Sequence, residues 1–99
     1  MKKIMYYAVY DVSANSIRNA IIHTLKNIGF TRIQKSVFCG RISSQQKKDL
    51  IEQIKIIIKN DDDSFYLIMS CHQCFGKIQI IGKGFDTAYV MDQKHSEVL

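Results

Sequence analysis

Apolar and polar positions change their spacing along this chain, and each change predicts a new element. Residues 4–10 are wholly apolar and rich in aromatic and β-branched side chains, which is typical of a strand buried on both faces. Asp11 follows directly. Because an unpaired carboxylate is costly to bury, we expect the strand to end before Asp11 and to leave that carboxylate at its carboxyl end.

A helical spacing follows and stops at Gly29, a residue type that suits the turn after a helix. Three polar residues offer N-caps for this helix: Ser13, Asn15 and Ser16. The apolar positions that recur on one helical face are Ile17, Ile21, Leu25 and Ile28. The spacing therefore predicts a helix of about 14 residues.

The second half of the chain repeats the alternation of strand and helix patterns. Residues 30–42 predict two short strands with a bend near Gln34 and Lys35. Ser43 and Gln46 fit a capping box, and the helix that they open ends near Asn60. We then expect a buried strand over 64–70, a turn over 71–76, a strand over 77–81 and a weakly patterned end in which Ala88–Met91 could form a terminal strand.

This order predicts an α+β, ferredoxin-like β-α-β-β-α-β fold with an additional C-terminal strand. We expect one such domain over residues 1–82 and a tail over 83–99, either a terminal strand or a partner-binding segment. Two helices would pack on one sheet face and leave the other face apolar and uncovered. A second copy, related by two-fold symmetry, is the simplest cover, and residues 77–81 are the candidate for pairing with its sheet edge. The protein is thus predicted to be homodimeric.

Composition narrows the class of partner. The chain has 99 residues and a formal charge of +5, which is a hint of a polyanionic partner. The odd number of cysteines, 3, argues against a disulfide framework. The N-terminal apolar run is brief and lacks a cleavage-site pattern, so we expect a cytoplasmic protein with no membrane span.

A set of short motifs occurs in a characteristic order. They are Y-D-V-S at 10–13, Arg18, Gly29-Phe30, Q-K-S-V-F at 34–38 and I-Q-I-I-G at 78–82. In this order and spacing the chain resembles the small CRISPR-associated adaptation subunit, the Cas2 family, over residues 4–82. The resemblance implies a two-fold dimer that is a metal-dependent endonuclease on single-stranded RNA or double-stranded DNA. It also implies a double-stranded DNA scaffold for the CRISPR integrase subunit, Cas1, in spacer acquisition.

The resemblance places the metal-site aspartate at Asp11, where two copies face each other. Two converging carboxylates repel, and a divalent cation such as Mg²⁺ (or Mn²⁺) between them removes the repulsion. A water held by that cation could attack a phosphodiester, which makes Asp11 the candidate catalytic and metal-binding residue. The alternative from position alone is that Asp11 only caps the following helix.

Basic residues are the candidate nucleic-acid contacts: Arg18, Arg32, Lys35 and Arg41. Arginine suits phosphate, and such backbone contacts bind without reading sequence. Taken alone, Arg18 is better interpreted as an ordinary solvated helix arginine, and Asn19 and Ala20 stand where many family members have a further basic residue. The family positions near the aspartate that could support the site are Tyr10, Ser36 and Phe38, although both aromatic residues suit the core.

Cys71 and Cys74 form a CxxC pair, which supplies only two of the four ligands of a structural zinc site. A redox CxxC normally opens a helix, and this pair is expected between strands, so we interpret it as a turn with incidental cysteines. Two other functions stay open: a toxin-type ribonuclease of similar fold and a ferredoxin-like module that binds a small ligand.

Overall fold

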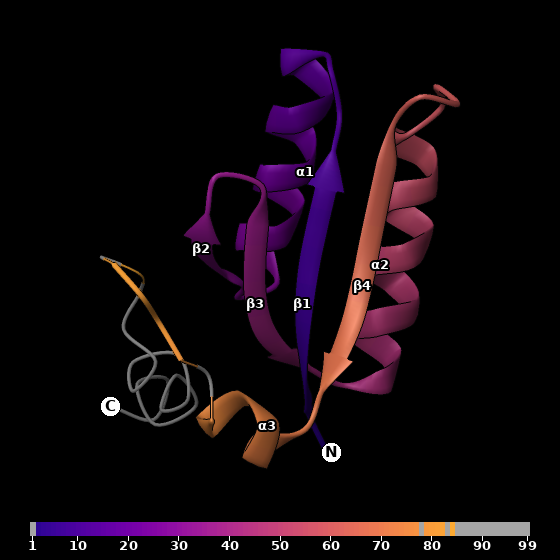
Figure 1. Ribbon diagram of the computed structural model, residues 1–99. Coiled ribbons are helices and arrows are strands. Elements are labelled where there is room, and N and C mark those ends of the chain that lie inside the picture. The colour runs from indigo at the N-terminus through magenta and orange to yellow at the C-terminus, as the bar shows by residue number, and fades with distance from the viewer. Residues whose placement is uncertain (1, 78, 83, 85–99) are drawn as a thin grey trace.

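Seven elements form the described part of the chain, and their first six follow the predicted order (Figure 1). The computed structural model describes residues 2–77, 79–82 and 84. The elements are β1 (Ile4–Asp11), α1 (Asn15–Asn27), β2 (Thr31–Gln34), β3 (Val37–Ile42), α2 (Ser44–Ile57), β4 (Ser64–Ser70) and α3 (His72–Gly76). The four strands form one sheet in the order β2-β3-β1-β4, and every neighbouring pair is antiparallel. The α+β, ferredoxin-like fold is therefore confirmed.

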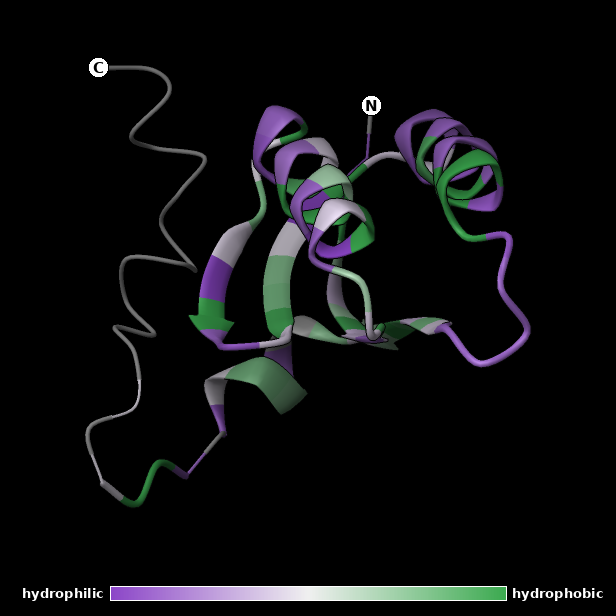
Figure 2. Cartoon of the chain, turned by 90° about the horizontal axis from the view of Figure 1, so that it is seen from above, coloured by the Kyte–Doolittle hydropathy of each residue, from purple (hydrophilic) through white to green (hydrophobic). Residues whose placement is uncertain are grey.

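Helices α1 and α2 cover one face of the sheet, and α3 lies on the opposite side (Figure 2). The main core lies between the sheet and α1 and α2, because alternate strand residues and one stripe of each helix point into this layer. Its buried members are Tyr6, Ala8, Tyr10, Val12, Ile21, Leu25, Phe30, Phe38, Ile42, Leu50 and Ile54.

A second, smaller cluster lies on the other face of the sheet. Phe75 of α3 is fully buried there with Met5 and Cys39, and its ring centroid lies 6.0 Å from that of Tyr7. Beyond α3 this face carries apolar residues that pair across neighbouring strands and that no described element covers. We call them the open face: Val9, Val37, Tyr66 and Ile68.

The helix ends agree with the sequence at two places and differ at two. Helix α2 ends at Ile57, three residues before the predicted end near Asn60. Ser43 and Gln46 form the predicted capping box, and Gly29 ends the first helical segment with a φ of +93°. The predicted caps of α1 are wrong, because Ala14 occupies the N-cap position and supplies no side-chain hydrogen bond. The first turn of α1 therefore begins without a side-chain cap.

The end of the described chain differs from the predictions. Residues 77 and 79–82 form no strand, so the strand predicted over 77–81 is wrong for this protomer. Residues 72–76 form the short helix α3 in place of the expected turn. The predicted terminal strand at Ala88–Met91 lies outside the described residues. No helix in the described ranges is long and apolar enough to cross a membrane.

Candidate functional site

Asp11 is the last residue of β1 and is exposed. Its backbone pairs with Ser64 of β4, so the strand includes the carboxylate that we expected just beyond it. Strand alternation places Asp11 on the side of Tyr7 and Val9, away from α1 and α2. It does not cap α1, and its carboxylate makes no hydrogen bond or ion pair within the described part of the chain. Asp11 is thus free to bind a ligand.

Arg18 is anchored beside the carboxyl end of β1. One of its terminal nitrogens donates to the carbonyl of Val12 at 2.8 Å, and the other donates to Oδ1 of Asn15. A guanidinium has five N–H groups, so these bonds fix the group and use only part of its donor capacity. The guanidinium of Arg18 is therefore fixed by hydrogen bonds at the same end of the sheet as Asp11.

The turn between β2 and β3 brings a second cation to this end. Arg32 donates to the carbonyls of Gln34 at 3.4 Å and Lys35 at 2.7 Å. The Tyr10 hydroxyl donates to the same Lys35 carbonyl at 3.1 Å, and the Tyr10 N–H donates to the Ser36 carbonyl at 3.1 Å. These bonds tie the turn to β1 one residue before Asp11.

Tyr10 and Phe38 are core residues, with exposed fractions of 2% and 0%. Their rings lie 6.3 Å apart between centroids, and the Arg32 guanidinium carbon lies 5.8 Å from the centre of the Phe38 ring. Burial raises the pKa of Tyr10, although the nearby charges of Arg32 and Arg18 act to lower it. Tyr10 therefore positions the turn as a neutral donor, and neither ring is exposed for stacking on a base.

Arg41 does not belong to this group. It pairs with Met5, six positions along β1 from Asp11, which corresponds to about 20 Å of strand. The sequence analysis grouped Arg41 with Arg18, Arg32 and Lys35 as candidate nucleic-acid contacts. Within one protomer the structure brings only the last three to the Asp11 end.

The described residues of one protomer contain no complete metal site. No group of three or more His, Cys, Asp or Glu side chains lies together among the described residues. Cys71 and Cys74 are exposed, whereas Cys39 is buried on the sheet. A cation at Asp11 would therefore need ligands in addition to those of the described residues of one protomer.

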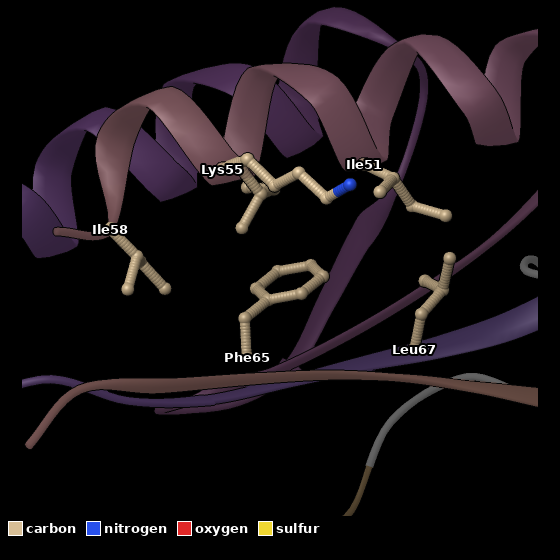
Figure 3. A pocket seen from close by; sticks show the side chains of 6 residues that line it. Ile51, Lys55, Ile58, Phe65 and Leu67 are labelled. Carbon is tan, nitrogen blue, oxygen red and sulfur yellow. The ribbon is translucent and has the colours of Figure 1, made fainter. Parts of the chain in front are cut away.

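A groove of about 350 Å³ opens between α2 and β4 on the helical side of the sheet (Figure 3). Its lining residues are Ile51, Ile54, Lys55, Ile58, Phe65 and Leu67. It contains no carboxylate, and the Lys55 ammonium lies 3.5 Å from Glu52 in an exposed ion pair. The groove lacks the groups that phosphodiester chemistry needs, and it lies on the other side of the sheet from Asp11.

Two polar residues near Asp11 have positioning contacts that the sequence did not predict. Asn15, interpreted as a cap, holds Arg18 three residues along the helix. Asp63, in the loop before β4, accepts a hydrogen bond from the Ser13 N–H at 3.3 Å. The i to i+3 spacing could have revealed the first contact, but the second joins residues 50 positions apart and has no local signal.

Comparisons with known proteins give a consistent result. The family model described as CRISPR associated protein Cas2 matches residues 4–78. A CRISPR-associated endoribonuclease Cas2 from Korarchaeum cryptofilum is 30% identical over 76 residues, which are 77% of this chain and 82% of that protein. A second relative, CRISPR-associated endoribonuclease Cas2 2 from Pyrobaculum aerophilum, is 46% identical over 56 residues. That match spans 56% of this chain and 62% of the relative, which is under two thirds of the relative's length. The crystal structure titled cas2 superposes with a TM-score of 0.70 at 28% identity, covering 83% of this chain and 90% of that one.

Proposed function

Because the chain belongs to the CRISPR-associated Cas2 family, we propose that two copies of it form a metal-dependent endoribonuclease centred on Asp11. The names of both relatives given above support RNA as the first substrate class. The observation that carries the proposal is an exposed carboxylate without a partner in the described chain, at the end of the inner strand β1.

The donor set at Asp11 fits a hard divalent cation, provided that a second copy contributes. Carboxylate oxygens are the ligands that Mg²⁺ prefers, and Mg²⁺ commonly keeps several waters with only one or two protein ligands. One Asp11 from each copy would supply two carboxylates. When bound, the cation neutralises negative charge at the phosphodiester and lowers the pKa of a bound water.

The remaining residues bind and orient the substrate in this proposal. Arg18 and Arg32 are held by backbone carbonyls, so their side chains would lose little conformational freedom when they bind phosphate. Lys35 is exposed on the turn and adds a flexible positive charge. Ser36 is half-buried beside Tyr10 and could donate its hydroxyl to a phosphate oxygen.

The replacement Asp11→Asn tests the proposal. It keeps the size of the side chain and removes the charge, so we expect cleavage of single-stranded RNA in Mg²⁺ to fall at least about 100-fold. Cleavage is measured on end-labelled RNA with highly purified protein. The matched control is Asp61→Asn, an exposed loop carboxylate, which should cleave like the unmodified protein. Equal cleavage by both variants would contradict the role of Asp11.

A second role is compatible with the same molecule and rests on its charge. We propose that the dimer, with a formal charge of +5 per chain, also binds double-stranded DNA through the backbone as a scaffold for the Cas1 integrase. Scaffolding needs a basic surface but no metal. Asp11→Asn should therefore retain DNA binding that weakens steeply with salt while it loses cleavage. Binding that is absent, or that does not respond to salt, would count against the scaffold role and leave the nuclease proposal standing.

A further inference from the structure

The two exposed cysteines lie together at the start of α3. Cys71 is the N-cap residue, and its Sγ accepts a hydrogen bond from the backbone N–H of Cys74 at 3.1 Å. Both thiols are exposed to solvent. The CxxC pair thus opens a helix, which the sequence had not predicted.

This placement suits a disulfide within the pair. Side chains three residues apart on a helix have Cβ atoms about 5–6 Å apart. A disulfide needs Cβ atoms about 3.5–4.5 Å apart. Because Cys71 is the cap and lies outside the regular helix, a small change in its backbone can supply the difference.

The two thiols also differ in acidity. The neighbouring Cys74 thiol and the Cys74 backbone N–H, which lies 3.1 Å from Cys71 Sγ, both lower the pKa of Cys71. The nearby Cys71 thiol in turn raises the pKa of Cys74. In such a pair the thiol of lower pKa, here Cys71, is the attacking cysteine, and the thiol of higher pKa, here Cys74, is the resolving cysteine.

The third cysteine, Cys39, is an internal control because its thiol is not expected to be oxidised. Cys39 of β3 is fully buried in one cluster with Met5 and Phe75, and burial raises its pKa to about 12. A neutral, inaccessible thiol does not react with disulfides. Oxidation should therefore be confined to the start of α3.

We propose that Cys71 and Cys74 are a redox-active pair that closes reversibly to an intrachain disulfide when it meets a small-molecule disulfide such as glutathione disulfide. The Cys71 thiolate attacks one glutathione sulfur, forms a mixed disulfide and releases one glutathione thiolate. Cys74 loses its proton and attacks Cys71, which forms the intrachain bond and releases the second glutathione. The protein is oxidised by two electrons, and glutathione disulfide is reduced to two thiols.

The disulfide would act on the sheet through Phe75. This residue follows Cys74 directly and is buried against Met5, Tyr7 and Cys39. A bond from Cys71 to Cys74 restrains the first turn of α3 and so holds Phe75 over one end of the sheet. Closing the pair should therefore reduce local unfolding of α3.

The chemistry is tested by intact mass and peptide mapping in glutathione redox buffers that contain a chelator. We expect the loss of two hydrogen atoms, mapped to the peptide that contains residues 71 and 74, with Cys39 still alkylated after unfolding. Cys74→Ser should stop at a mixed disulfide between Cys71 and glutathione. The proposal is overturned if the native pair stays reduced in a buffer that oxidises a short CxxC peptide. It is also overturned if disulfides form only between two copies of the protein, or if the pair still holds a zinc ion after treatment with the chelator.

The structural consequence is tested by trypsin cleavage after Lys77, the C-cap residue of α3. Oxidised protein should be cleaved at least about 3-fold more slowly than reduced protein. Cys71→Ser/Cys74→Ser should be cleaved at one rate in both buffers, and Cys39→Ala should keep the difference. Equal cleavage of oxidised and reduced native protein would refute the effect on α3.

Discussion

Asp11 and Asp63 lie near each other, yet their surroundings give them different roles. Asp63 precedes Ser64, which pairs with Asp11 across the sheet. The Asp63 carboxylate accepts the Ser13 N–H at 3.3 Å and so ties two connecting loops together. The Asp11 carboxylate has no such bond in the described chain. Residue type alone could not separate a structural carboxylate from an available one.

Gly40 offers a test of packing at a single residue. A Cβ at this position would lie 2.7 Å from Cδ1 and 3.0 Å from Cα of Phe30. Gly40→Ala should therefore lower the free energy of unfolding by about 1–3 kcal/mol through overpacking. Urea denaturation followed by circular dichroism measures the change.

Gly29→Ala is the comparison for this prediction. Gly29 has a φ of +93°, and no atom lies within 4 Å of the position that a Cβ would take there, so its replacement costs only backbone strain. Adding Phe30→Leu should recover part of the stability lost in Gly40→Ala and none of that lost in Gly29→Ala. No recovery in either background would rule out the steric explanation.

At the scale of elements, the long periodic segments were predictable and the short ones were not. Strand β1 and both long helices repeat their apolar spacing over eight or more residues, so the core face is encoded locally. Helix α3 has only five residues, too few for a helical repeat, and its cap is a cysteine. Residues 77 and 79–82 pair with no strand of the described sheet, and an apolar pattern alone does not form a strand without such pairing.

In the candidate site, too, only the features with a local sequence signal could be predicted. The position of Asp11 could be predicted because a carboxylate ends an apolar strand. The separation of Arg41 from the other basic residues could not be predicted, because it depends on the register that pairs Arg41 with Met5. Register is a long-range property, and residues 34–38 gave no sign of the bulge that the structure has between Arg32 and Gln34.

The N-termini of the two long helices predict opposite responses to substitution. Ser43 accepts from the Gln46 N–H at 3.2 Å, so Ser43→Ala should destabilise the protein by about 1 kcal/mol. Ala14 caps α1 without a side-chain bond, so Ala14→Ser should stabilise it by about 0.5–1 kcal/mol. Thermal unfolding measures both changes. Ser44→Ala, at an exposed position inside α2, is the control, and an effect as large as that of Ser43→Ala would argue against capping.

At the scale of the whole molecule, the two sides of the sheet are unequal. α1 and α2 bury one side, whereas α3 covers only part of the other (Figure 2). Tyr66 and Ile68 are 55% and 51% exposed on the open face. Exposed apolar residues that are contiguous across strands are typical of an interface. A second copy on this face would also bring in the second Asp11 that the proposed metal site requires.

Ile68→Lys tests this interface. Because Ile68 is already half exposed, the protomer should stay folded, while a buried charge at a dimer interface should shift the protein to a monomer. Sedimentation velocity measures the mass, and RNA cleavage should fall with the dimer. Ile56→Lys, on α2 at 68% exposure, should leave both unchanged. A dimer that survives Ile68→Lys with full cleavage would place the interface elsewhere.

The carbonyl of Lys35 accepts from both the Tyr10 hydroxyl and Arg32, and that carbonyl belongs to the main chain. Any amino acid at position 35 other than proline or glycine can therefore hold the turn in the same way. The side chain itself is exposed. Position 35 is thus a site where a dye can be attached next to the proposed cleavage centre as a reporter of bound nucleic acid, and where a reversed charge should weaken that binding while the turn keeps its conformation.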